Sequence, residues 1–228
     1  MAAQQAATLQ RFSDGRLLLN VVSGGDDSEQ QRFGDWLDHD ERYARTGEFL
    51  TIVKSVWGSD SFDFDGEYYK IRDGRVSEPP NPLPEFYFGG SSAAALPIAA
   101  EHVDVYLTWG EPPPQAAKAK IDRVRELAEA RGRTLRFGIR LHTITRDTSA
   151  AAWAVAEELV NELTPAQIEE ATRLHATSES EGQRRMTALH GGAGPTSWRS
   201  TRTCGRVLAW FAAAPAPPWS AATRRWPT

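Results

Sequence analysis

The sequence predicts an α/β fold built on a parallel sheet, and three observations support this prediction. Four short segments with strand character alternate with segments of helical periodicity, an alternation typical of parallel α/β sheets. The first of the four is a nearly continuous apolar run, which suits a strand covered on both faces. Polar residues gather at or near the ends of these segments, where barrels and open α/β sheets place their sites.

The first half of the chain is expected to contain five elements. A long helix capped by Asp38 is indicated by Leu50, Val53 and Trp57, which recur at helical spacing. A hairpin is expected to turn at Asp65-Gly66, a common hairpin dipeptide. The predicted elements are a helix end, a strand, the long helix, the hairpin and a second strand, at residues 2–11, 16–23, 38–57, 62–71 and 85–88.

The second half continues the alternation and then departs from it. The predicted elements are a strand, a helix, a strand and a helix, at residues 103–108, 113–130, 135–146 and 149–163. A polar helical insert then starts at Thr164-Pro165 and runs through His190. Because long excursions beyond a strand end often act as lids, we expect this insert to cover a site.

The segment Gly89-Gly90-Ser91-Ser92 follows the second strand directly and precedes an alanine-rich helix. Strand, Gly-Gly-Ser-Ser and helix together form an arrangement that binds phosphate, because glycines allow close approach, hydroxyls donate and a helix N-terminus favours an anion. The alternative is a plain tight turn with a serine cap. Asn20 interrupts the first strand, and a buried amide there needs a hydrogen-bond partner from the protein or a ligand.

Residues 135–146 have the pattern of one buried strand that carries two costly polar side chains. Alternation places Arg140 and His142 on one face, and Ile139 and Leu141 on the other. A buried cation is expensive unless it has a partner or a task. Two interpretations stay open: buried carboxylates satisfy both residues, or the two receive an anion in a cleft.

Composition indicates an ordinary globular protein. The chain has 228 residues, 40% hydrophobic and 25% charged, with a net charge of −4 that gives no reason to expect nucleic acid. A single cysteine, Cys204, excludes an internal disulfide and a cysteine-rich metal site. No apolar run approaches the roughly 18 residues of a membrane span, and the N-terminus lacks the blocks of a secretion signal. A cytoplasmic protein is therefore expected.

The composition changes near Gly191. From there to the end the chain contains no Asp or Glu, and four of the eight tryptophans fall in this tail. Disordered tails are usually poor in aromatic residues, so disorder alone does not explain this composition.

Several motifs resemble those of the flavin-dependent alkanesulfonate monooxygenases, within the luciferase-like monooxygenase superfamily. The most specific are Tyr106-Leu107-Thr108-Trp109-Gly110-Glu111-Pro112 and Phe137-Gly138-Ile139-Arg140-Leu141-His142. The resemblance spans roughly residues 2–192. The segments that carry it are residues 5–9, 15–24, 37–43, 87–92, 105–112, 136–142 and 180–192.

The resemblance implies a (β/α)8 TIM barrel that uses reduced FMN (FMNH2) and O2 to convert an alkanesulfonate to an aldehyde and sulfite, a reaction of sulfur metabolism. It also implies an NAD(P)H-dependent flavin reductase as partner, and a homo-oligomer in the intact family. The residues that it assigns are Asn20 and Ser23 along the flavin, Tyr43, Gly90, Ser91 and Ser92 at the flavin phosphate, Trp109 and Arg140 at the sulfonate, and Arg140 and His142 as catalytic residues.

The chain is shorter than such a barrel, which needs eight strands and about 250 residues. We therefore expect a partial barrel of about four strands over residues 1–192, truncated at its N-terminus, and an atypical, disordered tail over residues 193–228. Out-of-frame translation from about Ala193 would explain the composition of the tail. Half a barrel exposes strand edges, so we expect association or poor solubility, with the Arg140 side open to water and Ile139 still covered by helices.

Three hypotheses for function follow. The first is a fragment of a desulfonating monooxygenase with little or no activity alone. The second is an active enzyme of another branch, either a deazaflavin-dependent reductase or a different FMN monooxygenase. The third is a non-catalytic remnant that still binds flavin phosphate at residues 89–92.

Overall fold

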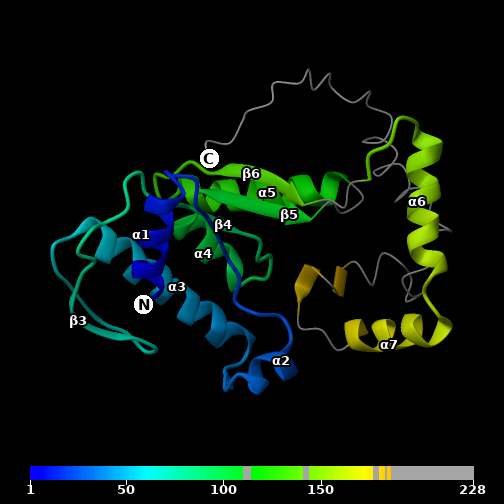
Figure 1. Ribbon diagram of the computed structural model, residues 1–228. Coiled ribbons are helices and arrows are strands. Elements are labelled where there is room, and N and C mark those ends of the chain that lie inside the picture. Colours follow the sequence, from blue (N-terminus) through cyan, green and yellow to red (C-terminus); the bar gives the residue numbers. More distant parts are fainter. Residues whose placement is uncertain (110–113, 141–143, 177–179, 183, 186–228) are drawn as a thin grey trace. The chain divides into compact units, whose positions relative to one another are not determined.

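The computed structural model describes residues 1–109, 114–140, 144–176, 180–182 and 184–185 (Figure 1). The chain divides into two compact units. Met1–Arg140 and Ser178–Arg185 belong to the first. The second contains helices α6 (Ser149–Asn161) and α7 (Pro165–Ala176). The predicted helix at 149–163 and the helical character of the insert are confirmed, and the site lies in the first unit.

A four-stranded parallel sheet organises the first unit. Its strands are β1 (Leu18–Val21), β4 (Glu85–Phe88), β5 (Val105–Trp109) and β6 (Arg136–Arg140), in the order β1-β4-β5-β6. This confirms the predicted fold class, a partial α/β barrel-type sheet of four strands. The second strand has the predicted bounds, and the first and fourth are shorter than predicted.

Five helices accompany this sheet in the described part of the first unit, along with a short turn after residue 180. They are α1 (Ala2–Phe12), α2 (Asp27–Arg32), α3 (His39–Gly58), α4 (Ala95–His102) and α5 (Pro114–Glu129). A capping box fixes the start of α3, because the Asp38 side chain accepts the Glu41 amide and the Glu41 side chain accepts the Asp38 amide. Helix α2, which the sequence pattern did not predict, is capped by Asp26.

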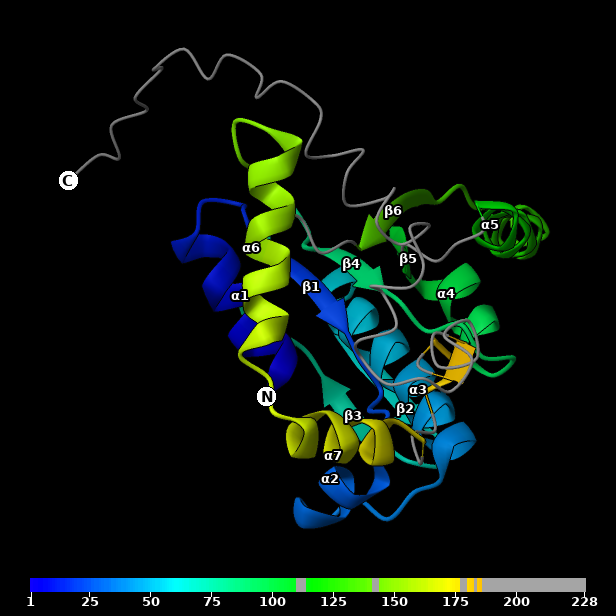
Figure 2. The ribbon, with the colours of Figure 1, turned by 90° about the vertical axis from the view of Figure 1, so that its right-hand side faces the viewer.

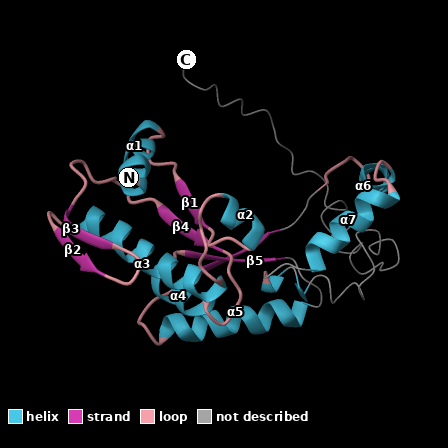
Figure 3. Ribbon diagram, turned by 90° about the horizontal axis from the view of Figure 1, so that it is seen from below, coloured by secondary structure: helices cyan, strands magenta, loops and turns pink. Residues whose placement is uncertain are grey.

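The core lies on one face of the sheet, beneath α3, α4 and α5 (Figure 3). Phe86, Phe88 and Tyr106 point to this face and are at most 2% exposed. Trp57 of α3 stacks on Phe86 with ring centroids 5.7 Å apart. Burying each such side chain contributes about 1.5–3 kcal/mol. Helices α3, α4 and α5 therefore fix the positions of the strand ends.

The opposite face of the sheet is open at both edges. Leu18 on β1 is 56% exposed, and Asn20 and Arg140 are exposed as well. The expectation that the Arg140 side would open to water is confirmed. The prediction of a buried strand at 135–146 holds at Leu135, which is 7% exposed, and is wrong at Ile139 and Arg140, which are exposed. The helix cover expected over Ile139, which is 57% exposed, is wrong too. The reason is that β6 is an edge strand of the described sheet.

The predicted hairpin is present as β2 (Phe62–Asp65) and β3 (Lys70–Gly74), paired antiparallel. Its turn is wider than the two residues expected, since the Gly66 amide donates to the Tyr69 carbonyl at 2.9 Å. The Glu48 carboxylate of α3 stabilises this turn by accepting the backbone amides of the three residues 67–69 at 2.7, 3.0 and 3.0 Å. The hairpin is thereby attached to α3.

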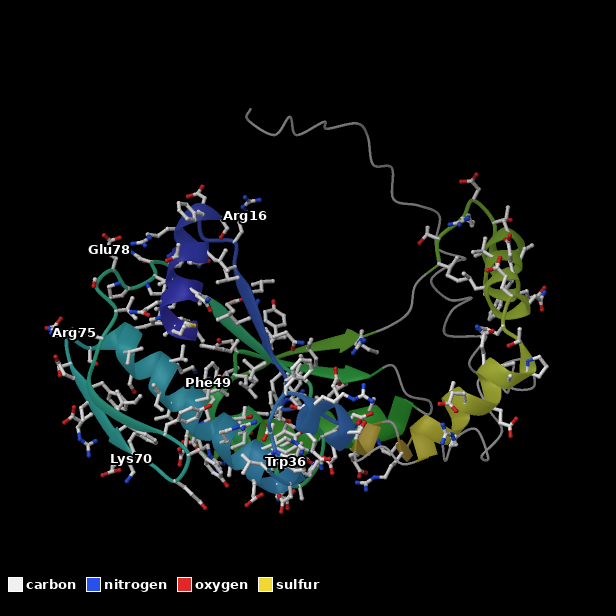
Figure 4. All side chains as sticks on the ribbon, turned by 60° about the horizontal axis from the view of Figure 1, so that its bottom comes forward. Arg16, Trp36, Phe49, Lys70, Arg75 and Glu78 are labelled. Atoms are coloured by element: carbon white, nitrogen blue, oxygen red, sulfur yellow. The ribbon has the colours of Figure 1, made fainter. Side chains whose placement is uncertain are left out.

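Large apolar side chains are exposed around α2. Phe33 and Trp36, which follow this helix, are 84% and 75% exposed, and Val22, which precedes it, is 74% exposed. Trp36 is labelled in Figure 4. Among the described residues, no helix combines the length and apolar character that crossing a membrane requires.

Candidate functional site

The carboxyl ends of the neighbouring strands β1 and β4 lie side by side at the same end of the sheet. The two strands are parallel neighbours, with Val21 in register with Phe88 (Figure 2). The segment Ser23-Gly24-Gly25 follows β1, and Gly89-Gly90-Ser91-Ser92 follows β4. The sheet thus brings the two polar segments predicted from the sequence to one end of the first unit.

Gly90 has no room for a side chain. A Cβ atom there would lie 2.7 Å from the Ala95 Cβ and 2.8 Å from the Phe88 ring. The Tyr106 hydroxyl donates to the Gly90 carbonyl at 2.9 Å, which fixes the peptide. The backbone of the segment is therefore held close against β4 and the start of α4.

The two serines of this segment have different surroundings. The Ser92 hydroxyl accepts the amide of Ala95 at 3.3 Å, the local contact expected for a plain serine-capped turn. The Ser91 hydroxyl instead accepts a hydrogen bond at 3.0 Å from Nη2 of Arg185, a residue 94 positions away. Ser92 thus makes a local turn contact just before α4, whose N-cap is Ala94, whereas Ser91 meets a cation from a distant part of the chain.

Sequence reasoning did not single out Arg185. It lies in a short helical turn at the described residues 180–182 and 184–185, within the predicted polar insert, where Arg184 and Arg185 are adjacent. Nη1 of Arg185 lies 3.3 Å from the Glu181 carboxylate, and Arg184 lies 2.9 Å from the same carboxylate. The hydrogen bond from Arg184, followed by the charge of Arg185, lowers the pKa of Glu181 below its ordinary value despite partial desolvation. The sequence signal that could have identified Arg185 is the pair of adjacent arginines within residues 180–192, a segment that carries the family resemblance.

The turn at 180–185 also approaches the segment after β1. A Cβ atom on Gly25 would lie 3.5 Å from the Ser180 Cβ, which is ordinary contact distance. Gly182 is buried. The turn therefore lies beside the segments that follow both strands. Ser23, which is half-buried, is two residues before Gly25 in the first of these segments.

Tyr43 reaches this end of the sheet from α3. Its ring meets the Phe88 ring edge-on, with centroids 6.1 Å apart, and the His39 ring at 4.9 Å. Phe88 is the last residue of β4, so Tyr43 is packed next to the residue that precedes Gly89. Tyr43 thus lies beside the last residue of β4, and its role at the flavin phosphate stays a prediction.

The predicted sulfonate residues lie elsewhere on the sheet. Trp109 of β5 and Arg140 of β6 are register partners. Following the register across the sheet, Asn20 pairs with Tyr87, and Tyr87 with Val105. Strand alternation then assigns positions 20, 109 and 140 to one face. His142 lies outside the described residues.

The register that pairs Asn20 with Tyr87 and Tyr87 with Val105 continues to Arg136 on β6, which is four residues before Arg140. With strands about 4.8 Å apart and residues about 3.3 Å apart along a strand, Asn20 and Arg140 are well separated on that face. Within the described residues, no cluster of three or more His, Cys, Asp or Glu could hold a metal ion. The described residues therefore bring Ser91 and Arg185 together at the end of β4 and leave an exposed arginine on β6.

Solved structures with a similar fold include a riboflavin lyase and two monooxygenases. A riboflavin lyase with modified FMN and riboflavin is 22% identical, with a TM-score of 0.66, over 76% of this chain and 44% of that one. EDTA monooxygenase from Chelativorans sp. BNC1 is 23% identical, with a TM-score of 0.63, over 75% and 45%. Long-chain alkane monooxygenase is 20% identical, with a TM-score of 0.65, over 84% and 46%.

The chain therefore spans about half the length of the solved structures that it matches. At these identities the likeness shows the fold. The sequence profile of the luciferase-like monooxygenases matches residues 1–204, which is most of the chain. The protein belongs to the luciferase-like monooxygenase family.

Proposed function

We propose that this chain carries the phosphate-binding part of a flavin site and one wall of an alkanesulfonate site. The observation that supports the proposal most directly is the meeting of Ser91, Arg185 and the tightly packed Gly90 at the end of β4. A phosphate needs hydrogen-bond donors, a cation and close approach of backbone, and this end of the sheet has all three.

FMN fits these residues. In the proposal Gly90, Ser91 and Ser92 hold its phosphate with the help of Tyr43 of α3. Asn20 and Ser23 lie along the remainder of the flavin, because they belong to β1 and the segment that follows it, beside β4. Reduced FMN, when bound, supplies the electrons that activate O2.

The substrate proposal rests on Arg140. The planar, cationic fork of a guanidinium matches an oxyanion such as a sulfonate. Arg140 is exposed on the described sheet, and its register partner is Trp109. In the proposal Trp109 and Arg140 bind the sulfonate, and Arg140 and His142 act as catalytic residues.

The proposed overall reaction converts an alkanesulfonate, O2 and reduced FMN into an aldehyde, sulfite, oxidised FMN and water. One oxygen atom enters the aldehyde as the carbon–sulfur bond breaks, and the other leaves as water. An NAD(P)H-dependent flavin reductase would regenerate reduced FMN. The matched structures are about twice as long as this chain, so complete turnover is proposed for the whole enzyme and little turnover for this chain alone.

The test measures flavin and sulfonate binding separately. FMN binding is followed by flavin fluorescence, and octanesulfonate binding by calorimetry with FMN present, with octanol as the uncharged comparison. We expect Arg140→Gln to weaken octanesulfonate binding at least tenfold. Arg136→Gln, on the same strand four residues earlier, is the matched control and should leave that binding within about twofold.

Two results would contradict the proposal. Absence of FMN binding would overturn the flavin assignment. Equal binding of octanesulfonate by the wild type and Arg140→Gln, or equal binding of octanesulfonate and octanol, would overturn the sulfonate assignment. Sulfite release, assayed with a flavin reductase present, then measures how much activity the chain retains.

A further inference from the structure

We propose that Arg185 is a phosphate-binding residue. Its guanidinium is paired with the Glu181 carboxylate until a phosphate monoester takes the place of that carboxylate. The inference rests on the proposed function, in which that monoester is the FMN phosphate. It adds a specificity residue to the site, because Arg185 would distinguish FMN from riboflavin, which lacks the phosphate.

Arg185 lies where a phosphate would bind in the proposed site. Its Nη2 donates to the Ser91 hydroxyl oxygen at 3.0 Å, so the guanidinium lies at the Gly-Gly-Ser-Ser segment itself. Since the serine oxygen accepts from Arg185, its own proton is available to donate to a third group. An oxyanion beside both residues would receive hydrogen bonds from the hydroxyl and from the guanidinium.

A carboxylate lies beside this guanidinium. The Oε1 atom of Glu181 lies 3.3 Å from Nη1 of Arg185, longer than the 2.9 Å contact between Glu181 and Arg184. A phosphate monoester carries about −1.5 to −2 charges at neutral pH and three acceptor oxygens. It is therefore the stronger partner for a guanidinium that already contacts Ser91.

Arg184 makes the exchange favourable. When Arg185 turns from the carboxylate to a phosphate, Glu181 keeps its hydrogen bond with Arg184. No charged group is then left without a partner, which is the condition that usually makes breaking an ion pair costly. The two arginine side chains also differ in exposure. Arg185, which would bind the phosphate, is 28% exposed, and Arg184, which would keep the Glu181 carboxylate, is 58% exposed.

The exchange would also secure the turn at 180–185. This turn lies beside Gly25 after β1 and beside Ser91 after β4. A phosphate held jointly by Ser91 and Arg185 would connect the turn to β4 more tightly than a single neutral hydroxyl does.

The experiment compares FMN, riboflavin and inorganic phosphate as ligands of the full chain. Arg185→Gln should weaken FMN binding at least tenfold and leave riboflavin binding within about twofold. Arg173→Gln is the control for the loss of an arginine from an ion pair that is local in sequence, because Arg173 pairs with Glu170 at i,i+3 as Arg185 pairs with Glu181 at i,i+4. It should leave the ratio of FMN to riboflavin affinity unchanged, and circular dichroism checks that each variant is folded.

Glu181→Gln is the second variant. It removes the competing charge and should raise the affinity for inorganic phosphate and for FMN several-fold, without affecting riboflavin. If Arg185→Gln changes FMN and riboflavin binding equally, or changes neither, or if Glu181→Gln weakens phosphate binding, the inference is wrong.

The outcomes separate this inference from the proposed function. If both flavins bind and neither depends on Arg185, the flavin site stands and the role of Arg185 fails. If phosphate binds through Arg185 and neither flavin binds, the role of Arg185 stands and the proposed function fails. A wild-type chain that binds none of the three ligands overturns both.

Discussion

The guanidinium of Arg42 makes an ion pair with the Asp27 carboxylate at 2.8 Å, although the arginine side chain is only 1% exposed. Its Nη1 also donates to the Leu37 carbonyl at 2.6 Å. Arg42 belongs to α3, whereas Asp27 begins α2, so a buried cation ties the segment between β1 and α3 to the core. That segment includes Ser23 of the proposed site.

Replacing Arg42 by methionine should lower the free energy of unfolding by about 2–4 kcal/mol, because a buried charge-assisted pair loses one partner and the Leu37 carbonyl loses its donor. Asp27→Asn should cost at least as much, about 3–5 kcal/mol, because the Arg42 side chain, which is only 1% exposed, then keeps its charge without the paired carboxylate. Urea unfolding measures both. A cost below about 1 kcal/mol for Asp27→Asn would contradict the view that the Asp27 carboxylate compensates the buried charge.

The contact between Glu48 and the hairpin turn predicts a local loss of order. Glu48→Gln replaces a carboxylate that accepts three backbone amides by a weaker neutral acceptor, and should cost about 1–2 kcal/mol. Faster amide exchange should be confined to residues 67–69. Glu67→Gln, at an exposed side chain of the same turn, is the control and should lie within about 0.5 kcal/mol of the wild type.

Two adjacent glycines provide a matched test of the close packing at the end of β4. A Cβ on Gly90 would meet Ala95 at 2.7 Å, whereas a Cβ on Gly89 meets nothing closer than the Leu107 carbonyl at 3.6 Å. Gly90→Ala should therefore destabilise the fold by about 1–3 kcal/mol and weaken FMN binding. Gly89→Ala should keep the wild-type stability, and a reversed order in thermal unfolding would show that Gly90 is not the constrained position.

His102 predicts how stability depends on pH. Burial lowers the pKa of His102 from its ordinary 6.5, helped by the charges of Lys54, Arg133 and Arg131 and opposed by Glu101. As the pH falls through 6.5, the unfolded chain takes up a proton that the folded chain takes up less readily, so this group makes the protein less stable at lower pH. The melting temperature should fall between pH 7.5 and 5.5, and His102→Gln should flatten that slope. An unchanged slope in the variant would exclude His102 as its source.

Local signals account for the elements that the sequence predicted well. Strand β4 has the predicted bounds because Pro84 precedes it and Gly89 follows it. Helix α3 begins where Asp38 and Glu41 form a capping box, which is a pattern of neighbouring residues. Such features need no knowledge of distant parts of the chain.

The features that the sequence did not predict depend on tertiary arrangement. The apolar alternation of residues 135–146 indicated burial, but Ile139 and Arg140 are exposed because burial depends on the neighbours of an edge strand. Arg185 meets Ser91 across 94 residues, and no periodicity encodes such a contact. Helix α2 has six residues, too few to show an amphipathic period.

The order of the four strands has a consequence for amide hydrogen exchange. Strands β4 and β5 have a described neighbour on each side, whereas β1 and β6 have one each in the described sheet. Along β1 and β6, alternate amides point to the neighbour or away from it. Alternate amides of these two strands should therefore exchange quickly in the isolated chain. Their exchange rates would report the pairing of a further strand with either edge, since such pairing would slow the exchange of these amides.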